Sequence, residues 1–266
     1  MSDPNQSPDG LTDTEQSFVS HLIELRDRLI RALIAVGVAF LVLAIYPSPS
    51  VLYDLLAMPL VQHLPKGATL IATNPISPFM VPIKVTMLAA LMVALPVVLY
   101  QIWAFVAPGL YSHEKKLVLP LIVSSSVLFY SGMAFCYFFV FGKVFTFIQN
   151  FAPKSITAAP DIEAYLSFVL NMFLAFGAAF EVPVVLVILA RMGIVTVEKF
   201  KSFRSYFVVI AFVVAAVVTP PDVVSQLSLA IPMCLLYELG IWSAQLFVKH
   251  TRAPDAEDDT TDAKPS

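Results

Sequence analysis

Long apolar stretches separated by short polar segments dominate the chain and predict an all-α integral membrane protein. A helix needs about 20 apolar residues to cross a bilayer, and we predict six transmembrane helices, four of about that length and two shorter. The predicted spans are residues 29–46, 85–106, 117–141, 164–190, 205–218 and 223–240. They form one membrane domain, residues 21–248, between disordered acidic tails at 1–20 and 249–266.

The uninterrupted apolar runs in the last two predicted spans, Ser205–Val218 and Val223–Tyr237, are short. The 14 residues of 205–218 would extend about 21 Å as a helix, less than a hydrocarbon core of about 30 Å. Either the sixth helix continues past Glu238 towards Phe247, or the bilayer is thinner beside these helices. We favour some thinning, because Glu238 lies a full turn or more inside that continuation.

The distribution of lysine and arginine predicts the orientation, because cytoplasmic segments are enriched in these residues. With a cytoplasmic N-terminus, twelve of the 16 basic residues fall in cytoplasmic segments and four on the other side. Both termini are therefore expected in the cytoplasm. The two longer loops on the opposite side, 47–84 and 142–163, are rich in proline, which restricts the backbone, so we expect them to pack as a cap.

Composition excludes several classes of protein. Hydrophobic residues make up 58% of the 266 residues and charged residues 13%, about half the charged fraction of a soluble domain. This excludes an ordinary soluble enzyme, a disordered chain and a nucleic-acid-binding protein. The net charge of −3 is the sum of two unlike parts of the chain. Residues 1–20 and 251–266 together carry −7, whereas residues 21–250 carry +4.

Ionisable residues inside the spans are few, and each is a functional candidate. Glu181 lies in the middle of the fourth span, with Pro183 two residues later. It is either a functional carboxylate or a structural one bonded to neighbouring backbone. Asp222 either has a role of its own or caps the sixth helix, and Gln226 is a weaker candidate.

Catalytic and metal-binding motifs are not found. There is no GxxxxGK[ST] for a nucleotide, and His113–Glu114 is not completed to HExxH, so we expect no enzyme activity, cofactor or metal. The serines at 124–126 have no GxSxG context and no companion histidine within a span. Hydrogen bonds within or between helices explain them better than nucleophilic catalysis.

Two polar segments lie at the predicted cytoplasmic surface. The amphipathic segment HLIELRDRLIRAL, residues 21–33, places Glu24 and Arg28 four residues apart on one helix face. The first cytoplasmic loop, FVAPGLYSHEKKL, places Glu114 beside two lysines.

Five segments resemble, in order, the signatures of one family. They are HLIELRDRL, TNPISPF, YQIWAFVAPGLYSHEKK, AFGAAFEVPV and TPPDVVSQLSLAIPM. The family is TatC, the large subunit of the twin-arginine protein translocase, and the resemblance covers about residues 20–245. One position departs from it: Asn74 stands where relatives can carry an acidic side chain, which argues against an ionic role for that loop.

The resemblance implies a glove-shaped, six-helix protein of the bacterial inner membrane with both termini cytoplasmic. Such proteins receive folded precursors through signal peptides with two consecutive arginines. They work with the single-span subunits TatB and TatA and with other copies of themselves, and the proton-motive force drives transport.

The resemblance also assigns candidate residues. Glu24 and Glu114 would bind the signal peptide, together with Phe105. The remaining matched functional positions are Pro59, Glu181, Asp222 and Gln226. Two carboxylates suit two guanidinium groups, because arginine forms bidentate pairs that lysine cannot form.

Two other functions remain open from the residues alone. A proton-coupled small-solute transporter could use Glu181 but would be expected to show an internal repeat, and we find none. An intramembrane enzyme would need a nucleophile and base that the sequence does not supply.

Overall fold

The computed structural model describes residues 9–62, 70–106, 115–151, 160–219 and 222–248. These residues are helical apart from short connections, and they contain no strand, only an isolated bridge between Ile71 and Asp161. The helices are α1 (Asp9–Ile45), α2 (Pro49–Val61), α3 (Ser77–Val106), α5 (Lys115–Phe135), α6 (Phe141–Phe151), α7 (Ile162–Phe180), α8 (Val182–Arg191), α9 (Val197–Ser202), α10 (Arg204–Val218) and α11 (Val223–Val248). A π-helical turn, Cys136–Val140, joins α5 to α6. The all-α prediction is confirmed.

Five helical segments of the described chain are long and apolar enough to cross a membrane. They are Val19–Ile45, Ser77–Val106, Leu119–Phe151, Ile162–Arg191 and Val223–Leu246. The predicted fifth span, 205–218, coincides with α10, which has only 15 residues and is shorter than these five.

The sixth predicted helix is longer than expected. It continues through Glu238 to Val248, so ending this span at residue 240 was wrong, and the first of the two alternatives holds for this helix. The carboxylate of Glu238 is exposed and pairs with Arg204 at the start of α10, at 2.8 Å. Because the charge is paired on the surface, the helix continues past it into the apolar residues beyond Gly240.

The N-terminal tail also differs from the prediction. Helix α1 begins at Asp9, so residues 9–20 are helical rather than disordered. Residues 11–20 contain no glycine or proline, and acidic residues near a helix N-terminus are favoured by the helix dipole. Residues 1–8 and the predicted C-terminal tail, 249–266, lie outside the described residues.

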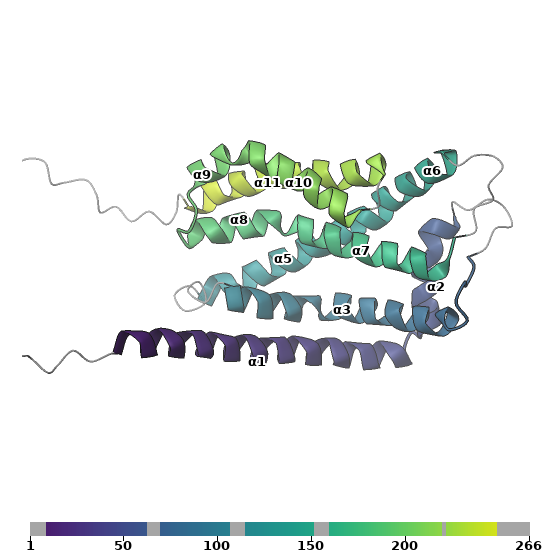
Figure 1. Cartoon of the computed structure of the whole chain (residues 1–266), viewed down its shortest axis with the longest axis horizontal. Coiled ribbons are helices and arrows are strands. Elements are labelled where there is room, and N and C mark those ends of the chain that lie inside the picture. Colours follow the sequence, from purple (N-terminus) through teal and green to yellow (C-terminus); the bar gives the residue numbers. More distant parts are fainter. Residues whose placement is uncertain (1–8, 63–69, 107–114, 152–159, 220–221, 249–266) are drawn as a thin grey trace, which may run out of the picture.

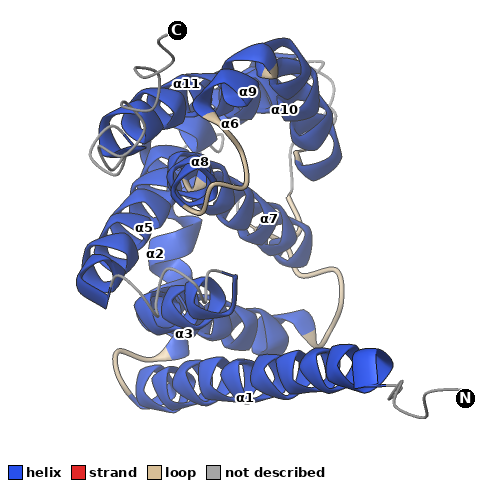
Figure 2. Ribbon diagram, turned by 90° about the vertical axis from the view of Figure 1, so that its left-hand side faces the viewer, coloured by secondary structure: helices blue, strands red, loops and turns tan. Residues whose placement is uncertain are grey.

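The long helices run roughly parallel to one axis, and the start of α1 lies at the same end of the molecule as the end of α11 (Figure 1). Helix α1 forms one edge of the bundle beside α3, while α10 and α11 lie at the opposite edge with α5, α7 and α8 between (Figure 2). We call the end that holds the start of α1 and the end of α3 the terminal end. The end that holds α2 is the cap end.

Close packing of α5 against α7 forms the centre of the bundle. Buried aromatic rings, among them Phe141 and Phe176, fill this region. A side chain at Gly177 would overlap the ring of Phe129, and one at Gly132 would overlap the backbone oxygen of Phe176. The two glycines therefore allow the helices to approach closely.

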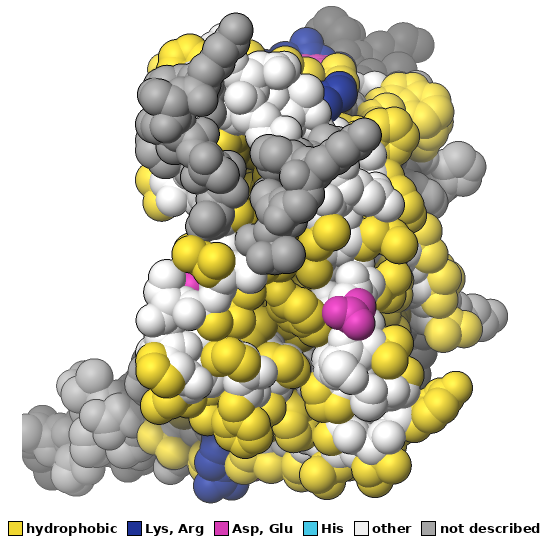
Figure 3. All heavy atoms as spheres, turned by 90° about the vertical axis from the view of Figure 1, so that its right-hand side faces the viewer, with side chains coloured by type: hydrophobic (Ala, Val, Ile, Leu, Met, Phe, Trp, Pro, Cys, Tyr) yellow, Lys and Arg dark blue, Asp and Glu magenta, His cyan; other side chains and the backbone are white. Residues whose placement is uncertain are grey.

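The described parts of the two segments at the cap end pack together, as predicted. The hydroxyl groups of Tyr137 and Tyr165 donate to backbone oxygens of α2, those of Leu55 and Leu56, both at 2.9 Å. Backbone bonds from Ile71 to Pro160 and from Ile162 to Ile71 join the two loops. Hydrophobic side chains cover much of the described surface at this end, with few charged ones among them (Figure 3).

Candidate functional site

Glu24 and Phe105, two of the predicted signal-peptide-binding residues, lie near one another at the terminal end. Glu24 is on α1 and Phe105 is in the last turn of α3. His21 connects them: its ring stacks on Phe105, with centroids 4.3 Å apart, and its Nδ1 is 3.9 Å from Glu24 Oε2. The packing of α1 against α3 therefore creates a surface with one carboxylate and two stacked rings.

The two oxygens of Glu24 have different surroundings. Oε1 accepts from Arg28, whose Nε lies 2.9 Å away, whereas Oε2 faces His21. The side chain of Glu24 is 37% exposed and that of Arg28 is 21% exposed. A carboxylate accepts about four hydrogen bonds, so Glu24 retains capacity for a further cation.

Two of the other predicted residues are not described in full. Glu114 lies outside the described residues, in the segment between α3 and α5. Pro59 belongs to α2 at the cap end, far along the bundle from Glu24 (Figure 1), and its side chain lies outside the described residues.

Glu181 occupies the junction between α7 and α8. Pro183 lacks a backbone N–H and is tolerated in the first turn of a helix, which is consistent with α8 beginning as a new helix here. Glu181 is only 8% exposed. Its Oε2 accepts from the Ser125 hydroxyl at 2.6 Å, and Ser125 Oγ accepts from Trp103 Nε1 at 2.8 Å.

Two serines of the run 124–126 make the kinds of hydrogen bond that we predicted. Ser125 bonds between helices, and Ser124 bonds within its own helix to Leu121 O at 2.9 Å, as we predicted. Sequence reasoning missed Trp103 as a partner, because nothing in the apolar pattern distinguishes its ring from those of its neighbours.

Asp222 and Gln226 lie where α10 meets α11. Asp222 Oδ1 accepts from the backbone N–H of Ser225 at 2.7 Å, so its predicted capping role is confirmed. Gln226 Nε2 donates to Phe212 O at 3.3 Å and so links α11 to α10. These residues are near neither Glu24 nor Phe105, because α11 begins at the cap end (Figure 1).

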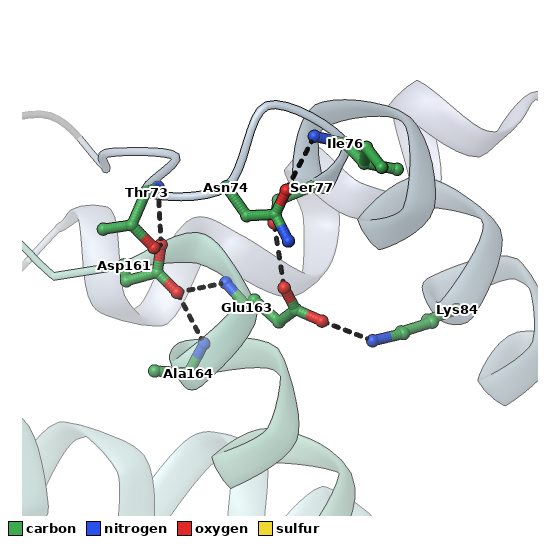
Figure 4. Close-up of polar contacts among 8 residues, drawn as sticks. All are labelled: Thr73, Asn74, Ile76, Ser77, Lys84, Asp161, Glu163 and Ala164. Atoms are coloured by element: carbon green, nitrogen blue, oxygen red, sulfur yellow. Dashed lines mark hydrogen bonds and ion pairs between the residues drawn. The ribbon is translucent and has the colours of Figure 1, made fainter.

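A polar cluster that the sequence analysis did not predict joins the two loops of the cap (Figure 4). One Asp161 oxygen accepts from the backbone N–H and the hydroxyl of Thr73, at 3.0 and 2.9 Å, and the other caps α7 through Glu163 and Ala164. The backbone hydrogen bond from Thr73, with those from Ala164 and the Thr73 hydroxyl, lowers the pKa of Asp161.

The second half of this cluster is ionic. Glu163 accepts from Ser77 Oγ at 2.9 Å and from Lys84 Nζ at 2.7 Å. Asn74 does not join it: its Oδ1 accepts from the backbone N–H of Ile76 at 3.1 Å and closes a local turn. The described residues contain no group of three or more side chains able to hold a metal ion.

Comparison with known proteins gives consistent matches over most of the chain. The model of the family "Sec-independent protein translocase protein (TatC)" matches residues 20–232. A protein of that name from Escherichia coli K12 is 51% identical over 233 residues, covering 88% of this chain and 90% of the relative. Its counterpart from Halothiobacillus neapolitanus is 48% identical over 261 residues, 96% of this chain and 71% of the relative.

A solved structure is also similar. The crystal structure of a twin-arginine translocase receptor, TatC, is 40% identical and has a TM-score of 0.73, covering 86% of this chain and 99% of that one. The likeness therefore extends from sequence to the arrangement of the helices.

Proposed function

The chain belongs to the TatC family of Sec-independent protein translocase components, and we propose that it is the receptor that binds the two consecutive arginines of a signal peptide. The observation that carries this proposal is the position of Glu24 beside His21 and Phe105 at the junction of α1 and α3.

The chemistry of this surface suits an arginine. A guanidinium group pairs with a carboxylate and also stacks on aromatic rings, and Glu24 and the ring pair of His21 and Phe105 offer both contacts. Glu114 supplies the second carboxylate in this proposal. It belongs to the segment that begins directly after Val106, the last residue of α3, so this segment starts at the same end as Glu24.

The rest of the proposal follows the family. The chain crosses the bacterial inner membrane six times, with α10 as the fifth and shortest crossing and both termini in the cytoplasm. The hydrophobic part of the signal lies along the bundle, where Glu181 contacts it. TatB and TatA dock at α10 and α11, near Asp222 and Gln226, and the proton-motive force drives export of the folded precursor.

Photo-crosslinking of a twin-arginine signal peptide to membranes that contain this chain tests the proposal. We expect Glu24→Gln and Glu114→Gln each to lower crosslinking about tenfold or more, because each removes a charge-assisted hydrogen bond. Glu198→Gln is the matched control, since Glu198 is an exposed carboxylate on α9 at the same end. Normal crosslinking in both Glu24→Gln and Glu114→Gln would contradict the proposal.

A further inference from the structure

An apolar groove with a volume of about 280 Å³ lies between α5 and α8 and is open at the surface of the bundle. Helix α8 packs more extensively on α11 than on α5, and Figure 2 shows α8 between these two helices. The residues that line the groove come mainly from α5 and α8, and they include Leu121, Ser124, Leu128, Val187, Arg191 and, from α11, Ser243.

The groove runs along α8 from the middle of the bundle to the terminal end. Its lining residues on α8 extend from Pro183, next to the junction with α7, to Arg191 in the last turn. Eight residues of helix rise about 12 Å, which is most of one leaflet of a hydrocarbon core about 30 Å thick. Arg191 is also the last residue of the apolar segment Ile162–Arg191. A guanidinium group therefore lies where this segment leaves the hydrocarbon.

The middle of the groove offers little to a polar ligand. The hydroxyl of Ser124 donates to Leu121 O within its own helix at 2.9 Å. Apart from two serines and Arg191, the described residues that line the groove are apolar, and none of them is a carboxylate. A ligand that fits this groove is therefore apolar over most of its length and anionic at the end beside Arg191.

The position of Arg191 has a local explanation that does not account for the groove. A cation in the last turn of a helix is favoured by the helix dipole. A guanidinium group has five N–H donors, however, and pairs with two oxygens of a phosphate, so Arg191 can bind an anion in addition to its contacts within the chain. Lys115 and Lys116 begin α5 about one turn before Pro120, so further basic residues lie at this end of the bundle.

The surface beside the groove suits the apolar part of a membrane. Neighbouring positions on the three helices carry exposed apolar side chains, namely Leu119, Val123, Val185 and Trp242. In lipid, an empty groove forfeits dispersion contacts along its walls. An acyl chain, a single row of CH₂ groups, can fill it. A helix of about 10–12 Å diameter would need roughly three times this volume over the same length.

We propose that this groove binds an anionic phospholipid, with one acyl chain along α8 and the phosphate on Arg191. Basic pockets between transmembrane helices suit such headgroups. A zwitterionic lipid would bring an ammonium group to a site with no carboxylate among its described lining residues. The bound lipid fills the space between α5 and α8. The site does not rest on the receptor function, since it uses neither Glu24 nor Glu114.

Native mass spectrometry of the purified, delipidated chain tests the headgroup contact. The probes are phosphatidylglycerol and phosphatidylcholine with the same acyl chains. We expect wild type to bind phosphatidylglycerol about fivefold more tightly, because one basic residue near a membrane surface attracts anionic lipid by about 1 kcal/mol. Arg191→Gln should lose most of this preference. Lys201→Gln is the matched control and should keep it, since Lys201 is an exposed basic residue of α9 at the same end (Figure 1).

Val187→Phe tests the acyl chain. Its larger side chain would occupy part of the groove and should lower the affinity for both lipids about fivefold or more, because the acyl chain loses dispersion contacts. Val185→Phe is the matched control, because Val185 is exposed on the same helix and is not among the lining residues. If Val187→Phe does not accumulate, Leu121→Phe on the opposite wall makes the same test.

Several results would overturn the proposal. Equal binding of the two lipids by wild type, or an unchanged preference in Arg191→Gln, would remove the anionic headgroup from the site. An equal loss in Lys201→Gln would assign the preference to general charge. Unchanged affinity in Val187→Phe would place the acyl chain elsewhere.

A photo-crosslinking amino acid in place of Ser124, an exposed residue at the groove, identifies the occupant in intact membranes. An adduct with the mass of a phospholipid would support the proposal. An adduct with a protein would show instead that a partner helix covers the groove.

Discussion

The ring of His21 lies nearly parallel to the ring of Phe105, with an interplanar angle of 17° and centroids 4.3 Å apart. This contact links α1 to the last turn of α3, one helical turn from Glu24. It gives His21, a residue that we did not select from the sequence, a place in the proposed arginine site.

We expect His21→Ala to weaken signal-peptide binding. A stacked ring pair contributes about 0.5–1.5 kcal/mol, so crosslinking should fall about two- to tenfold as Phe105 loses its neighbour. His21→Phe keeps a ring over Phe105 and should retain most of the binding. Equal crosslinking by the alanine variant and wild type would show that the stack does not support the site.

Arg28 is expected to compete with the signal peptide for Glu24. Its guanidinium group donates to Oε1, and such a pair on a helix is worth about 0.2–0.5 kcal/mol. Arg28→Gln should therefore strengthen binding of a twin-arginine peptide about twofold, measured by titration. Arg31→Gln removes the same charge one turn away and is the control; an equal gain in both variants would assign the effect to net charge instead.

Gly177→Val should destabilise the bundle. Its added side chain would overlap the ring of Phe129 in the packed interface between α5 and α7, and overpacking of a core costs about 1–3 kcal/mol. Thermal unfolding in detergent measures the loss. Gly37→Val is the matched control, because a Cβ at Gly37 meets no atom within 4 Å. Similar melting temperatures for the two variants would contradict the packing argument.

Stability of the cap is expected to fall in acid. Hydrogen bonds, first of all from the backbone N–H of Thr73, lower the pKa of Asp161. The ionised carboxylate therefore stabilises the folded chain fully above its unfolded pKa, about 3.9, and this contribution is lost as the pH falls through the lower folded value.

The variant Asp161→Asn measures this contribution. The melting temperature of wild type should exceed that of Asp161→Asn near neutral pH, and the difference should shrink below about pH 4. Thr73→Val removes the hydroxyl that donates to Asp161. In a chain that carries Thr73→Val, Asp161→Asn should therefore lower the melting temperature by less. A gap that stays constant with pH would mean that the charge of Asp161 does not stabilise the cap.

Apolar length and periodicity predicted the helices well, because a membrane core demands helices of a minimum length. The second and fourth predicted spans, 85–106 and 164–190, lie within α3 and within α7 and α8. The end of α11 was misjudged because Glu238 was considered alone, and its pairing with Arg204 depends on how two helices pack.

The contacts within the candidate sites were harder to predict. Ser125 and Glu181 are 56 residues apart, and His21 and Phe105 are on different helices. In a chain with so many apolar and aromatic residues, hydropathy does not specify which faces meet. Local signals performed better: capping was one of the two interpretations of Asp222, and its partner, Ser225, is only three residues away.

The position of α1 has a consequence for how this protein is made. In the span Val19–Ile45, no residue of the apolar 18-residue window is buried in the bundle. Helix α1 packs chiefly against α3. A transmembrane helix satisfies its own backbone and is stable alone in lipid. In the proposed topology, α1 therefore enters the bilayer before α3, because synthesis starts at the N-terminus. The contact between His21 and Phe105 beside Glu24 forms only after α3 has been made.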